Sequence, residues 1–327
     1  MSEWPMDDFC AEEYGDPSNR RFHAQPVACP SCGPHYFSLE GGEVLRGDSE
    51  AIQRTAMRLR AGGIVAIKGL GGYHLACDAR NEQAVNGLRA RKFRKEKPFA
   101  LMVTNIEIAR SLISVGPEAE TLLNSVARPI VLAPARFELP GVAPQNDELG
   151  VMLPYTPLHH LLFAAGAPEI LVMTSANRSS EPIAYLDEDA LQQLAGIADG
   201  FLIGERPIAR RIDDSVARVG VFGPAILRRA RGYAPSAAAM LPSDRPILAL
   251  GADLKNAITL VIEGQAFVSQ YIGDLAHYQS FCAFSETIRD LLSMYDVDPE
   301  KLLVVHDNHP QFVSTLRASE FSSSEKF

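Results

Sequence analysis

An α/β fold with helices covering a sheet is the class that this 327-residue sequence predicts. Between about residues 48 and 232, amphipathic segments long enough for helices alternate with short apolar runs of strand length. Glycine and proline residues separate these segments where turns are needed. The chain is longer than one typical domain and suggests two or three, and its apolar and charged fractions are those of a globular protein.

The first elements of this region show the pattern most clearly. Residues 49–63 space their apolar side chains for one helical face and end on a glycine pair, which is a stop signal. Residues 64–67 (IVAI) predict a buried strand, and residues 79–92 predict a helix with Asp78 or Asn81 as its cap. Further strands are predicted at 99–103, 129–133, 169–174 and 200–204, and a loop of the length of many functional lids at 134–148.

The two ends of the chain differ from this central region. Residues 1–45 are rich in Pro, Gly and Cys without sustained periodicity, so a fold there needs a stabilising cross-link. Residues 234–246 have the composition of a linker. We expect a Cys-containing segment at 1–45, an α/β domain at 46–235 and a further segment at 246–327. Within the last, the pattern predicts short strands with turns at 251–256 and 263–264, a helix near 280–295 and a strand at 301–307.

Positive charge is concentrated in two stretches of an acidic chain. The formal net charge is −9, which disfavours a general nucleic-acid coat, because phosphate binding rests on net positive surface. Residues 89–97 nevertheless hold six basic side chains and one Glu, and residues 206–231 hold seven Arg and two Asp. We call these stretches the first and the second basic tract. A solvated basic face explains either tract alone, whereas a polyphosphate held between them accounts for both.

Two uncharged turns complete the chemistry-bearing segments. The glycine turn at 68–75 (KGLGGYHL) follows a strand and lets backbone N–H groups approach phosphate oxygens. It matches neither established glycine-rich phosphate motif, so a tight strand exit stays open as the alternative. In the segment 173–182 (MTSANRSSEP), Ser175 and Asn177 could hold a carbonyl, an amide or a phosphate edge. The alternative there is a capped turn before the next helix.

The sequence predicts a cytoplasmic protein without membrane contact. No apolar run approaches the roughly 20 residues that span a bilayer, and the N-terminus lacks the basic and apolar regions of a signal peptide. Five Cys in such a chain are poor disulfide candidates. Cys29 and Cys32 are better interpreted as metal ligands.

Taken together, these segments resemble the YrdC-like nucleotide-binding family. The matching features are the glycine turn with "KGLGGYHLACDA", the pair Lys92-x-Arg94, the SAN turn at 175–177, and Ser215 with "ILRRARGY". The flanks resemble the HypF carbamoyltransferase family of nickel–iron hydrogenase maturation. The flanking motifs are "EYGDPSNRRFHAQPVACPSCGPHYF", "ELGVMLPYTPLHHLLF" and "GADLKNAITLVIEGQAFVSQYIGDL", and the resemblance runs to about residue 320.

The resemblance implies a fold and a two-step reaction. The fold is a YrdC-like twisted mixed sheet with flanking helices, preceded by a small zinc-finger segment and followed by an incomplete ASKHA-like segment. In the first step, carbamate derived from carbamoyl phosphate reacts with ATP to give carbamoyl adenylate and pyrophosphate. In the second, the carbamoyl group passes to the C-terminal cysteine of the acceptor protein HypE. Zn²⁺, ATP and Mg²⁺ are the implied cofactors.

The resemblance also assigns roles to residues. Lys92, Arg94 and Arg228 are expected to contact phosphates, and Ser175 and Asn177 to hold the carbamoyl end. We place Lys92, Arg94, Ser175 and Asn177 in the catalytic set. The further candidates for nucleotide binding, of which Tyr73 and His74 would shape the pocket, are Lys68, Gly71, Gly72, Tyr73, His74, Lys97, Ser215, Arg229 and Arg231.

This sequence departs from the family pattern at the finger and at both ends. The finger should hold two C-x2-C pairs separated by 18 residues, but Asp7 stands where the first Cys is expected. We expect Cys10, Cys29 and Cys32 to bind zinc with Asp7 or a water as the fourth ligand. The alternative is a decayed finger. The family's preceding acylphosphatase-like domain and its later His-rich metal motif are missing, so we expect a fragment that does not complete the transfer alone.

Three other interpretations stay open. A threonylcarbamoyl-adenylate synthase shares the nucleotide pocket but not the finger or the "GADLKN" segment. A double-stranded RNA-binding module is compatible with the two basic tracts and opposed by the acidic remainder. An inactive remnant would bind only partners such as a HypE-like protein.

Overall fold

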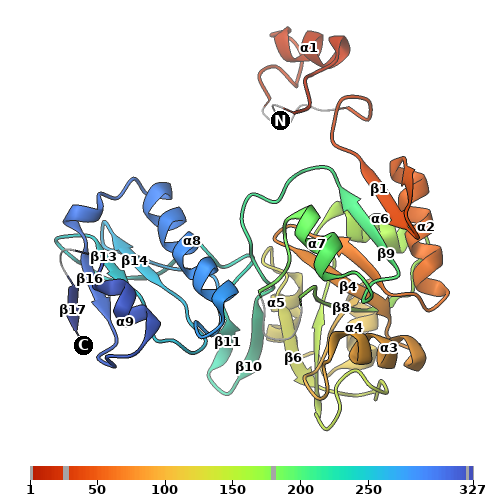
Figure 1. Cartoon of the computed structure of the whole chain (residues 1–327). Helices are drawn as coiled ribbons and strands as arrows, with labels where there is room; N and C mark the ends of the chain where they lie inside the picture. Colours follow the sequence, from red (N-terminus) through yellow and green to blue (C-terminus); the bar gives the residue numbers. More distant parts are fainter. Residues whose placement is uncertain (1–2, 25–28, 178–181, 322–323, 327) are drawn as a thin grey trace.

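The computed structural model describes residues 3–24, 29–177, 182–321 and 324–326. Three parts follow one another along the chain (Figure 1). They are a small segment around helix α1 (Asp8–Gly15), a large α/β domain, and a smaller α/β unit at the C-terminal side. Within the described ranges, no helix combines the length and the apolar character needed to cross a membrane.

One mixed sheet organises the large domain. Its 11 strands lie in the order β11-β10-β6-β7-β5-β8-β4-β3-β9-β1-β2. The pairings of β10 with β6, β3 with β9 and β5 with β7 are parallel, and the others in this sheet are antiparallel. The predicted α/β class with a mixed sheet is therefore confirmed. The strands are β1 (Tyr36–Glu40), β2 (Glu43–Arg46), β3 (Val65–Lys68), β4 (Tyr73–Asp78), β5 (Ala100–Val103), β6 (Ile130–Pro134), β7 (Glu148–Met152), β8 (Ile170–Ser175), β9 (Gly200–Gly204), β10 (Val216–Gly220) and β11 (Gly223–Arg228).

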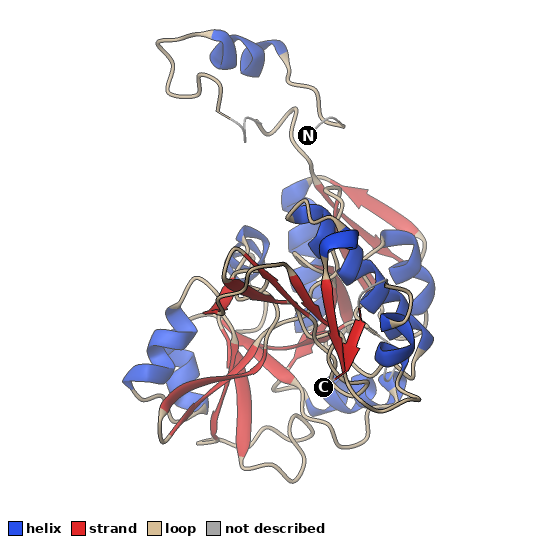
Figure 2. Ribbon diagram, turned by 90° about the vertical axis from the view of Figure 1, so that its left-hand side faces the viewer, coloured by secondary structure: helices blue, strands red, loops and turns tan. Residues whose placement is uncertain are grey.

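Helices cover both faces of this sheet, as Figure 2 shows from the side. Side chains alternate across each strand, so Phe201 and Ile203 of β9 join one apolar core while Leu202 joins the other. The second core is closed by α2 (Asp48–Arg60) and α6 (Pro157–Ala164). The first core is closed by α3 (Glu82–Lys92), α4 (Ile106–Leu112), α5 (Pro117–Asn124) and α7 (Asp187–Gln193).

Helix ends follow the predicted signals. The side chain of Asn81, not that of Asp78, accepts a hydrogen bond from the Ala84 N–H and caps α3. Helix α2 ends at Arg60, and the predicted glycine stop follows after Ala61, where Gly62 has φ +82°. At the other end of α3, Phe93 adopts the left-handed conformation, and the first basic tract leaves the helix at that residue.

Several strands were not predicted from the sequence. Strand β4 begins at Tyr73, inside the segment 68–75 predicted as the glycine turn, and β7 lies between the loop predicted at 134–148 and α6. Strand β1 and all but the last residue of β2 fall within residues 1–45, and they pair into the large sheet through β9. Strands β10 and β11 form an antiparallel pair inside the second basic tract. Their Arg, Pro and Gly content hides the strand pattern, because β11 is an edge strand with four exposed residues and β10, which lies between β11 and β6, buries only one side chain.

The C-terminal unit is a second mixed sheet with two helices. Its order is β12-β15-β14-β13-β16-β17, and α8 (Tyr278–Met294) and α9 (Val313–Ala318) pack on an apolar core with Leu248 and Val304. The linker prediction for residues 234–246 is wrong in part, because β12 lies within it and pairs with β15. The remaining elements are β12 (Ala237–Met240), β13 (Ile247–Ala249), β14 (Thr259–Ile262), β15 (Gln265–Val268), β16 (Leu303–His306), β17 (Ser324–Lys326) and the 3-10 turn Pro299–Lys301.

Candidate functional site

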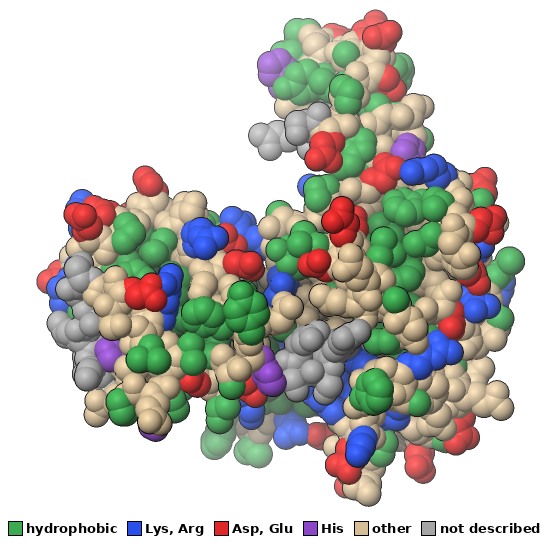
Figure 3. Space-filling model, in the orientation of Figure 1, with side chains coloured by type: hydrophobic (Ala, Val, Ile, Leu, Met, Phe, Trp, Pro, Cys, Tyr) green, Lys and Arg blue, Asp and Glu red, His purple; other side chains and the backbone are tan. Residues whose placement is uncertain are grey.

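A cavity of about 440 Å³ lies between the large domain and the C-terminal unit. Both basic tracts contribute to its lining although more than 100 positions separate them in the chain. Figure 3 shows Lys and Arg side chains near the junction of the large domain and the C-terminal unit. The basic lining residues are Lys92, Arg94, Lys95 and Lys97 of the first tract and Arg210, Arg211 and Arg228 of the second. Such a concentration of fixed cations suits a polyanionic ligand.

Lys92 is the last residue of α3 and is only 3% exposed. Its Nζ donates hydrogen bonds to the Ser175 carbonyl at 2.8 Å, to the Asn177 carbonyl at 2.6 Å and to Asn177 Oδ1 at 2.5 Å. The cation therefore fixes the turn that follows β8. Ser175 and Asn177 both line the cavity, so Lys92 sets the position of the neutral polar groups beside the cationic wall. Residues 178–181, the rest of the predicted SAN segment, lie outside the described residues.

Arg94 and Lys97 lie close together on the cavity wall. The Arg94 Nε donates to the Lys97 carbonyl at 3.0 Å, and the guanidinium carbon lies 5.1 Å from the centre of the Phe99 ring. Burial, with the positive charges of Arg89 and Arg228, lowers the pKa of Arg94 to about 10. Burial, with Arg94 and Arg228, also lowers the pKa of Lys97. A bound anion would relieve this repulsion between cations.

The second tract supplies Arg228, the last residue of β11. Its Nη1 donates to Asp213 Oδ2 at 3.2 Å, and its guanidinium carbon lies 4.7 Å from the centre of the Tyr271 ring. Tyr271 belongs to the C-terminal unit. Neither Asp213 nor Tyr271 was predicted from the sequence as a site residue, because no local pattern marks a contact between segments so far apart.

One face of α8 and its N-cap form the opposite wall of the cavity. This wall is joined to the second tract by an ion pair in which Arg210 Nε lies 3.1 Å from Asp290 Oδ2. The other face of the helix packs into the C-terminal core. The sequence predicted this helix but not its role as a cavity wall. The wall residues are His277, Ser280, Ala283, Glu286, Thr287 and Asp290.

The glycine turn is not among the residues that line the cavity. A Cβ on Gly71 would lie 2.0 Å from Ile212 Cγ2, and one on Gly72 would lie 2.6 Å from Ile183 Cδ1. The two glycines are therefore required for close packing of protein against protein at this turn. Beside them, the Lys68 ammonium lies 2.8 Å from the Asp187 carboxylate, and the Tyr73 hydroxyl donates to the same group at 2.7 Å.

A buried polar cluster holds other residues that the sequence analysis assigned to nucleotide binding. His74 Nε2 and Arg231 Nε each lie 2.8 Å from the Asp214 carboxylate. Although burial acts to raise it, the pKa of Asp214 is lowered by His74 and Arg231. Ser215 Oγ accepts from the Ala230 N–H and donates to the Arg231 carbonyl. None of these side chains lines the cavity.

Arg229 uses its side chain to bind backbone carbonyls. Its Nη2 donates to the carbonyls of Tyr233 at 2.7 Å and Ser236 at 2.6 Å, and its Nε donates to Val268 at 3.3 Å. It ties β11 to the start of the C-terminal unit and is absent from the cavity lining. The three Arg in residues 228–231 thus have three different environments.

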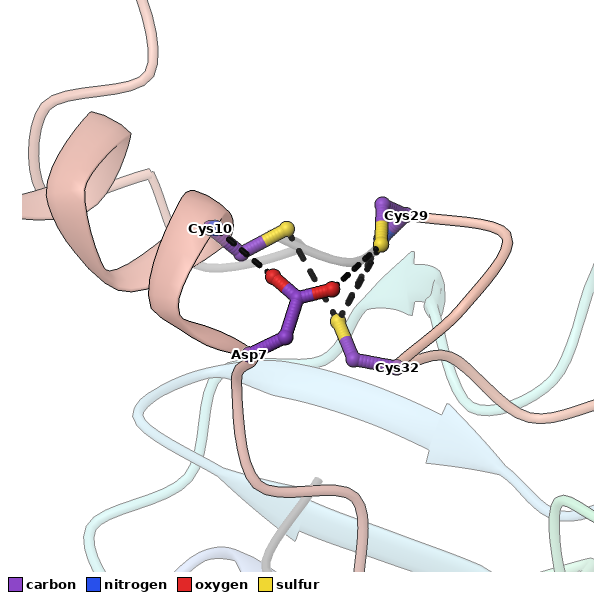
Figure 4. Close-up of side chains that lie close together, drawn as sticks. All are labelled: Asp7, Cys10, Cys29 and Cys32. Atoms are coloured by element: carbon purple, nitrogen blue, oxygen red, sulfur yellow. Dashed lines mark hydrogen bonds between the residues drawn. The ribbon is translucent and has the colours of Figure 1, made fainter.

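A second cluster lies in the N-terminal segment (Figure 4). Asp7, Cys10, Cys29 and Cys32 place one ligand atom each within 4.8 Å of the others. The Sγ atoms of Cys10 and Cys32, and those of Cys29 and Cys32, are 3.7 Å apart. Thiolates on tetrahedral zinc, each about 2.3 Å from the metal, are about 3.8 Å apart, so these two sulfur pairs have the spacing of zinc ligands. The Asp7 carboxylate caps α1 through the Cys10 N–H and lies 2.9 Å from Cys29 Sγ, in the place of a fourth ligand.

Three family models match the chain. The Sua5/YciO/YrdC model, described as "Telomere recombination", matches residues 57–230. The HypF Kae1-like domain matches residues 242–327, and the HypF finger matches residues 8–39. The finger match begins one residue after Asp7, the position at which this chain departs from the cysteine pattern.

Among curated relatives, carbamoyltransferase HypF of Rhodobacter capsulatus is 47% identical over 316 residues, which are 95% of this chain and 42% of that protein. Threonylcarbamoyl-AMP synthase of Xanthomonas euvesicatoria pv. vesicatoria is 31% identical over 170 residues, 47% of this chain and 87% of that protein. A crystal structure of full-length HypF in the phosphate- and nucleotide-bound form superimposes with a TM-score of 0.92 at 43% identity, covering 100% of this chain and 43% of that one. The chain thus spans less than half the length of these HypF relatives.

Proposed function

From the membership of this chain in the HypF family, with a Sua5/YciO/YrdC-type domain at residues 57–230, we propose a function for the cavity. We propose that the cavity is the site where carbamate is activated with ATP. The carbamate would come from carbamoyl phosphate. One carbamate oxygen attacks the α-phosphorus of ATP, the bond from that phosphorus to the β-phosphate oxygen breaks, and pyrophosphate leaves. The product is carbamoyl adenylate. The observation that carries this proposal is the meeting of both basic tracts with the Ser175–Asn177 turn around one cavity.

The arrangement of charge and neutral groups supports this chemistry. Arg94, Lys97 and Arg228 are placed to neutralise the negative charge that develops on the leaving pyrophosphate. Ser175 and Asn177 offer a hydroxyl and an amide that can hold the carbamoyl nitrogen and oxygen. Lys92 acts by holding this turn through its hydrogen bonds. Mg²⁺ bound to the phosphates of ATP would supply further charge neutralisation.

We assign the remaining predicted residues a supporting role. Lys68, Tyr73, His74, Ser215 and Arg231 use their polar atoms within the large domain, and Arg229 joins the two units. Gly71 and Gly72 let the loops around Ile212 and Ile183 pack closely behind the cavity. Their substitution would then act through the fold, not through a lost ligand contact.

For the complete protein of this family, we propose transfer of the carbamoyl group to the C-terminal cysteine of a HypE-like acceptor. In the N-terminal segment, we propose a structural Zn²⁺ held by Cys10, Cys29, Cys32 and Asp7. We also propose a cytoplasmic location, because three of the five cysteines lie where they can hold a metal, a use of cysteine that is typical of reducing compartments.

Calorimetric titration of ATP in the presence of Mg²⁺ tests the proposal. We expect binding by the wild-type chain and about 10- to 100-fold weaker binding by Arg94→Ala and by Arg228→Ala, since a charged hydrogen bond to phosphate is lost. Arg206→Ala is the matched control, because Arg206 is exposed in the same tract and does not line the cavity. If all three variants bind ATP like the wild type, the cavity is not the nucleotide site.

Isotope exchange between ATP and pyrophosphate then identifies the acceptor. Exchange that depends on carbamoyl phosphate supports the proposed function. Exchange that depends on threonine and bicarbonate supports a threonylcarbamoyl-adenylate synthase, the second candidate, which the match to threonylcarbamoyl-AMP synthase favours. Affinity for double-stranded RNA that survives saturating ATP and falls steeply with salt would indicate an RNA-binding module instead.

A further inference from the structure

Arg228 is held in the cavity wall from two sides. Its Nη1 donates to Asp213 Oδ2 at 3.2 Å, and its guanidinium carbon lies over the Tyr271 ring, 4.7 Å from the ring centre. In the part of the chain that the structure describes, its side chain makes no other hydrogen bond. A guanidinium has five N–H donors, so most of its edge is left for a ligand.

Tyr271 reaches this position from the C-terminal unit, just beyond the end of β15. Its N–H donates to the Arg229 carbonyl at 2.7 Å, and the Arg229 side chain donates back to the Val268 carbonyl at 3.3 Å. The ends of β11 and β15 are therefore fixed to each other on both sides of the ring contact. The structure gives the Tyr271 hydroxyl no hydrogen-bond partner among the described residues. The contact with Arg228 consequently depends on the ring and not on the hydroxyl.

Building on the ATP-activating function proposed above, we propose that Tyr271 is a positioning residue for Arg228. The ring supports the face of the guanidinium, and the N–H edge stays available for paired hydrogen bonds to phosphate oxygens. Asp213 fixes one end of that edge. The phosphate site is then completed by a residue of the C-terminal unit, and the large domain alone would hold Arg228 in a wider range of rotamers.

A double-mutant cycle on the whole chain tests this role. Dissociation constants are measured for ATP and for inorganic triphosphate with wild type, Tyr271→Leu, Arg228→Ala and the double variant. We expect Tyr271→Leu to weaken binding about 3- to 10-fold in the wild-type background, the size of a partly buried cation–π contact. In the Arg228→Ala background the same change should have no further effect. Tyr271→Phe should restore the binding that Leu loses.

Each other outcome has a defined meaning. Equal losses from Tyr271→Leu in both backgrounds would show that the ring acts through the fold, and the proposal would be overturned. If Tyr271→Phe bound the anions as weakly as Tyr271→Leu, the effect would depend on the hydroxyl, and the proposal would be overturned as well. If the wild type binds triphosphate but not ATP, the proposed function fails, while the cycle on triphosphate still decides the role of Tyr271. Binding of neither anion overturns both.

Discussion

Lys92 and Lys95 lie three residues apart in the first basic tract and have opposite environments. Lys92 is 3% exposed and donates to three acceptors of the Ser175–Asn177 turn, whereas Lys95 is exposed at the cavity rim. The burial of a charge without its hydrogen bonds is costly, and so is the burial of carbonyls without their donor. Substitution of Lys92 therefore tests the effect of its buried hydrogen bonds on stability, whereas substitution of Lys95 tests the loss of an exposed charge alone.

We expect Lys92→Met to lower the free energy of unfolding by about 2 to 3 kcal/mol, because three partly buried acceptors lose a charged donor. Lys95→Met, the control, should change it by less than about 0.5 kcal/mol, since exposed substitutions have small effects. Urea denaturation followed by circular dichroism measures both. Equal changes in the two variants would contradict a structural role for Lys92.

His159 gives a pH-dependent prediction. The side chain is 1% exposed, and burial, followed by the charge of His74, lowers its pKa from 6.5 to about 3. Arg231 and His160 act in the same direction, and Asp214 opposes them. A depressed pKa in the folded state means that the neutral ring is favoured on folding. Its contribution to stability is complete above pH 6.5 and is lost as pH falls from there toward 3.

Between pH 7.5 and pH 5, this loss should amount to about 2 kcal/mol in the wild type. We expect His159→Leu to remove that part of the pH dependence while keeping the apolar packing beside Tyr155. The measurement is the free energy of unfolding from urea titrations at both pH values. Parallel pH curves for the two proteins would show that His159 does not carry the effect.

At the level of elements, several apolar strand runs and the capped helices were predictable, whereas the buried strands β4 and β7 and the exposed strands β11 and β12 were not. The runs at 64–67, 99–103 and 200–204 are apolar because both sheet faces are covered, and each became a strand. Strand β12 has four exposed residues and a composition rich in Ala, so its pairing with β15 left no local signal. Pairing partners far along the chain, and not local propensity, determine such strands.

Two glycines of the large domain make a matched pair of substitutions. Gly87 lies inside α3, and the nearest atom to an added Cβ, in Ile64, is 3.9 Å away, which is an ordinary contact. Gly71→Ala would instead place its Cβ 2.3 Å from the Ile212 carbonyl oxygen. We expect Gly87→Ala to stabilise the protein by about 0.5 to 1 kcal/mol through helix propensity. Gly71→Ala should destabilise it by more than about 2 kcal/mol through steric overlap.

Thermal unfolding of the two Ala variants checks this contrast. A neutral Gly71→Ala would mean that the loop holding Ile212 can move away from the turn. In that case the same variant should still bind ATP, because neither Gly71 nor Gly87 lines the cavity. If Gly71→Ala folded normally but lost ATP binding, the glycine turn would be part of the nucleotide site.

On the scale of the whole molecule, the candidate site depends on a meeting of segments that no local pattern encodes. The two basic tracts were recognised by charge, and the resemblance to a family suggested that they converge. Charge alone could not separate Arg228 at the cavity from Arg231, which is paired with Asp214 in the interior. The charge pattern also could not identify Tyr271, because its contact with Arg228 depends on how the C-terminal unit packs against β11.

The N-terminal segment is attached to the rest of the protein in a different way. Among described residues from 3 to 34, hydrogen bonds and ion pairs stay within the segment. Contact with the large domain begins at His35, whose N–H donates to the Glu205 carboxylate at 3.1 Å. We therefore propose that the finger ends near Pro34 and that the large domain begins with β1. This separation determines what metal removal should do.

Zinc removal should unfold the finger and leave the large domain intact. A segment of this size has little apolar core, so its fold depends on the metal, while the sheet has two cores of its own. We expect atomic emission to find one zinc per chain. Chelation or Cys10→Ser should remove this zinc, and the control Cys282→Ser should retain it. Without zinc, protease should cleave before about residue 35, and ATP affinity should stay within about twofold, as the cavity is built from residues 92–290. If chelation weakened ATP binding as much as Arg228→Ala does, the finger would have to support the cavity through contacts that the described residues do not make.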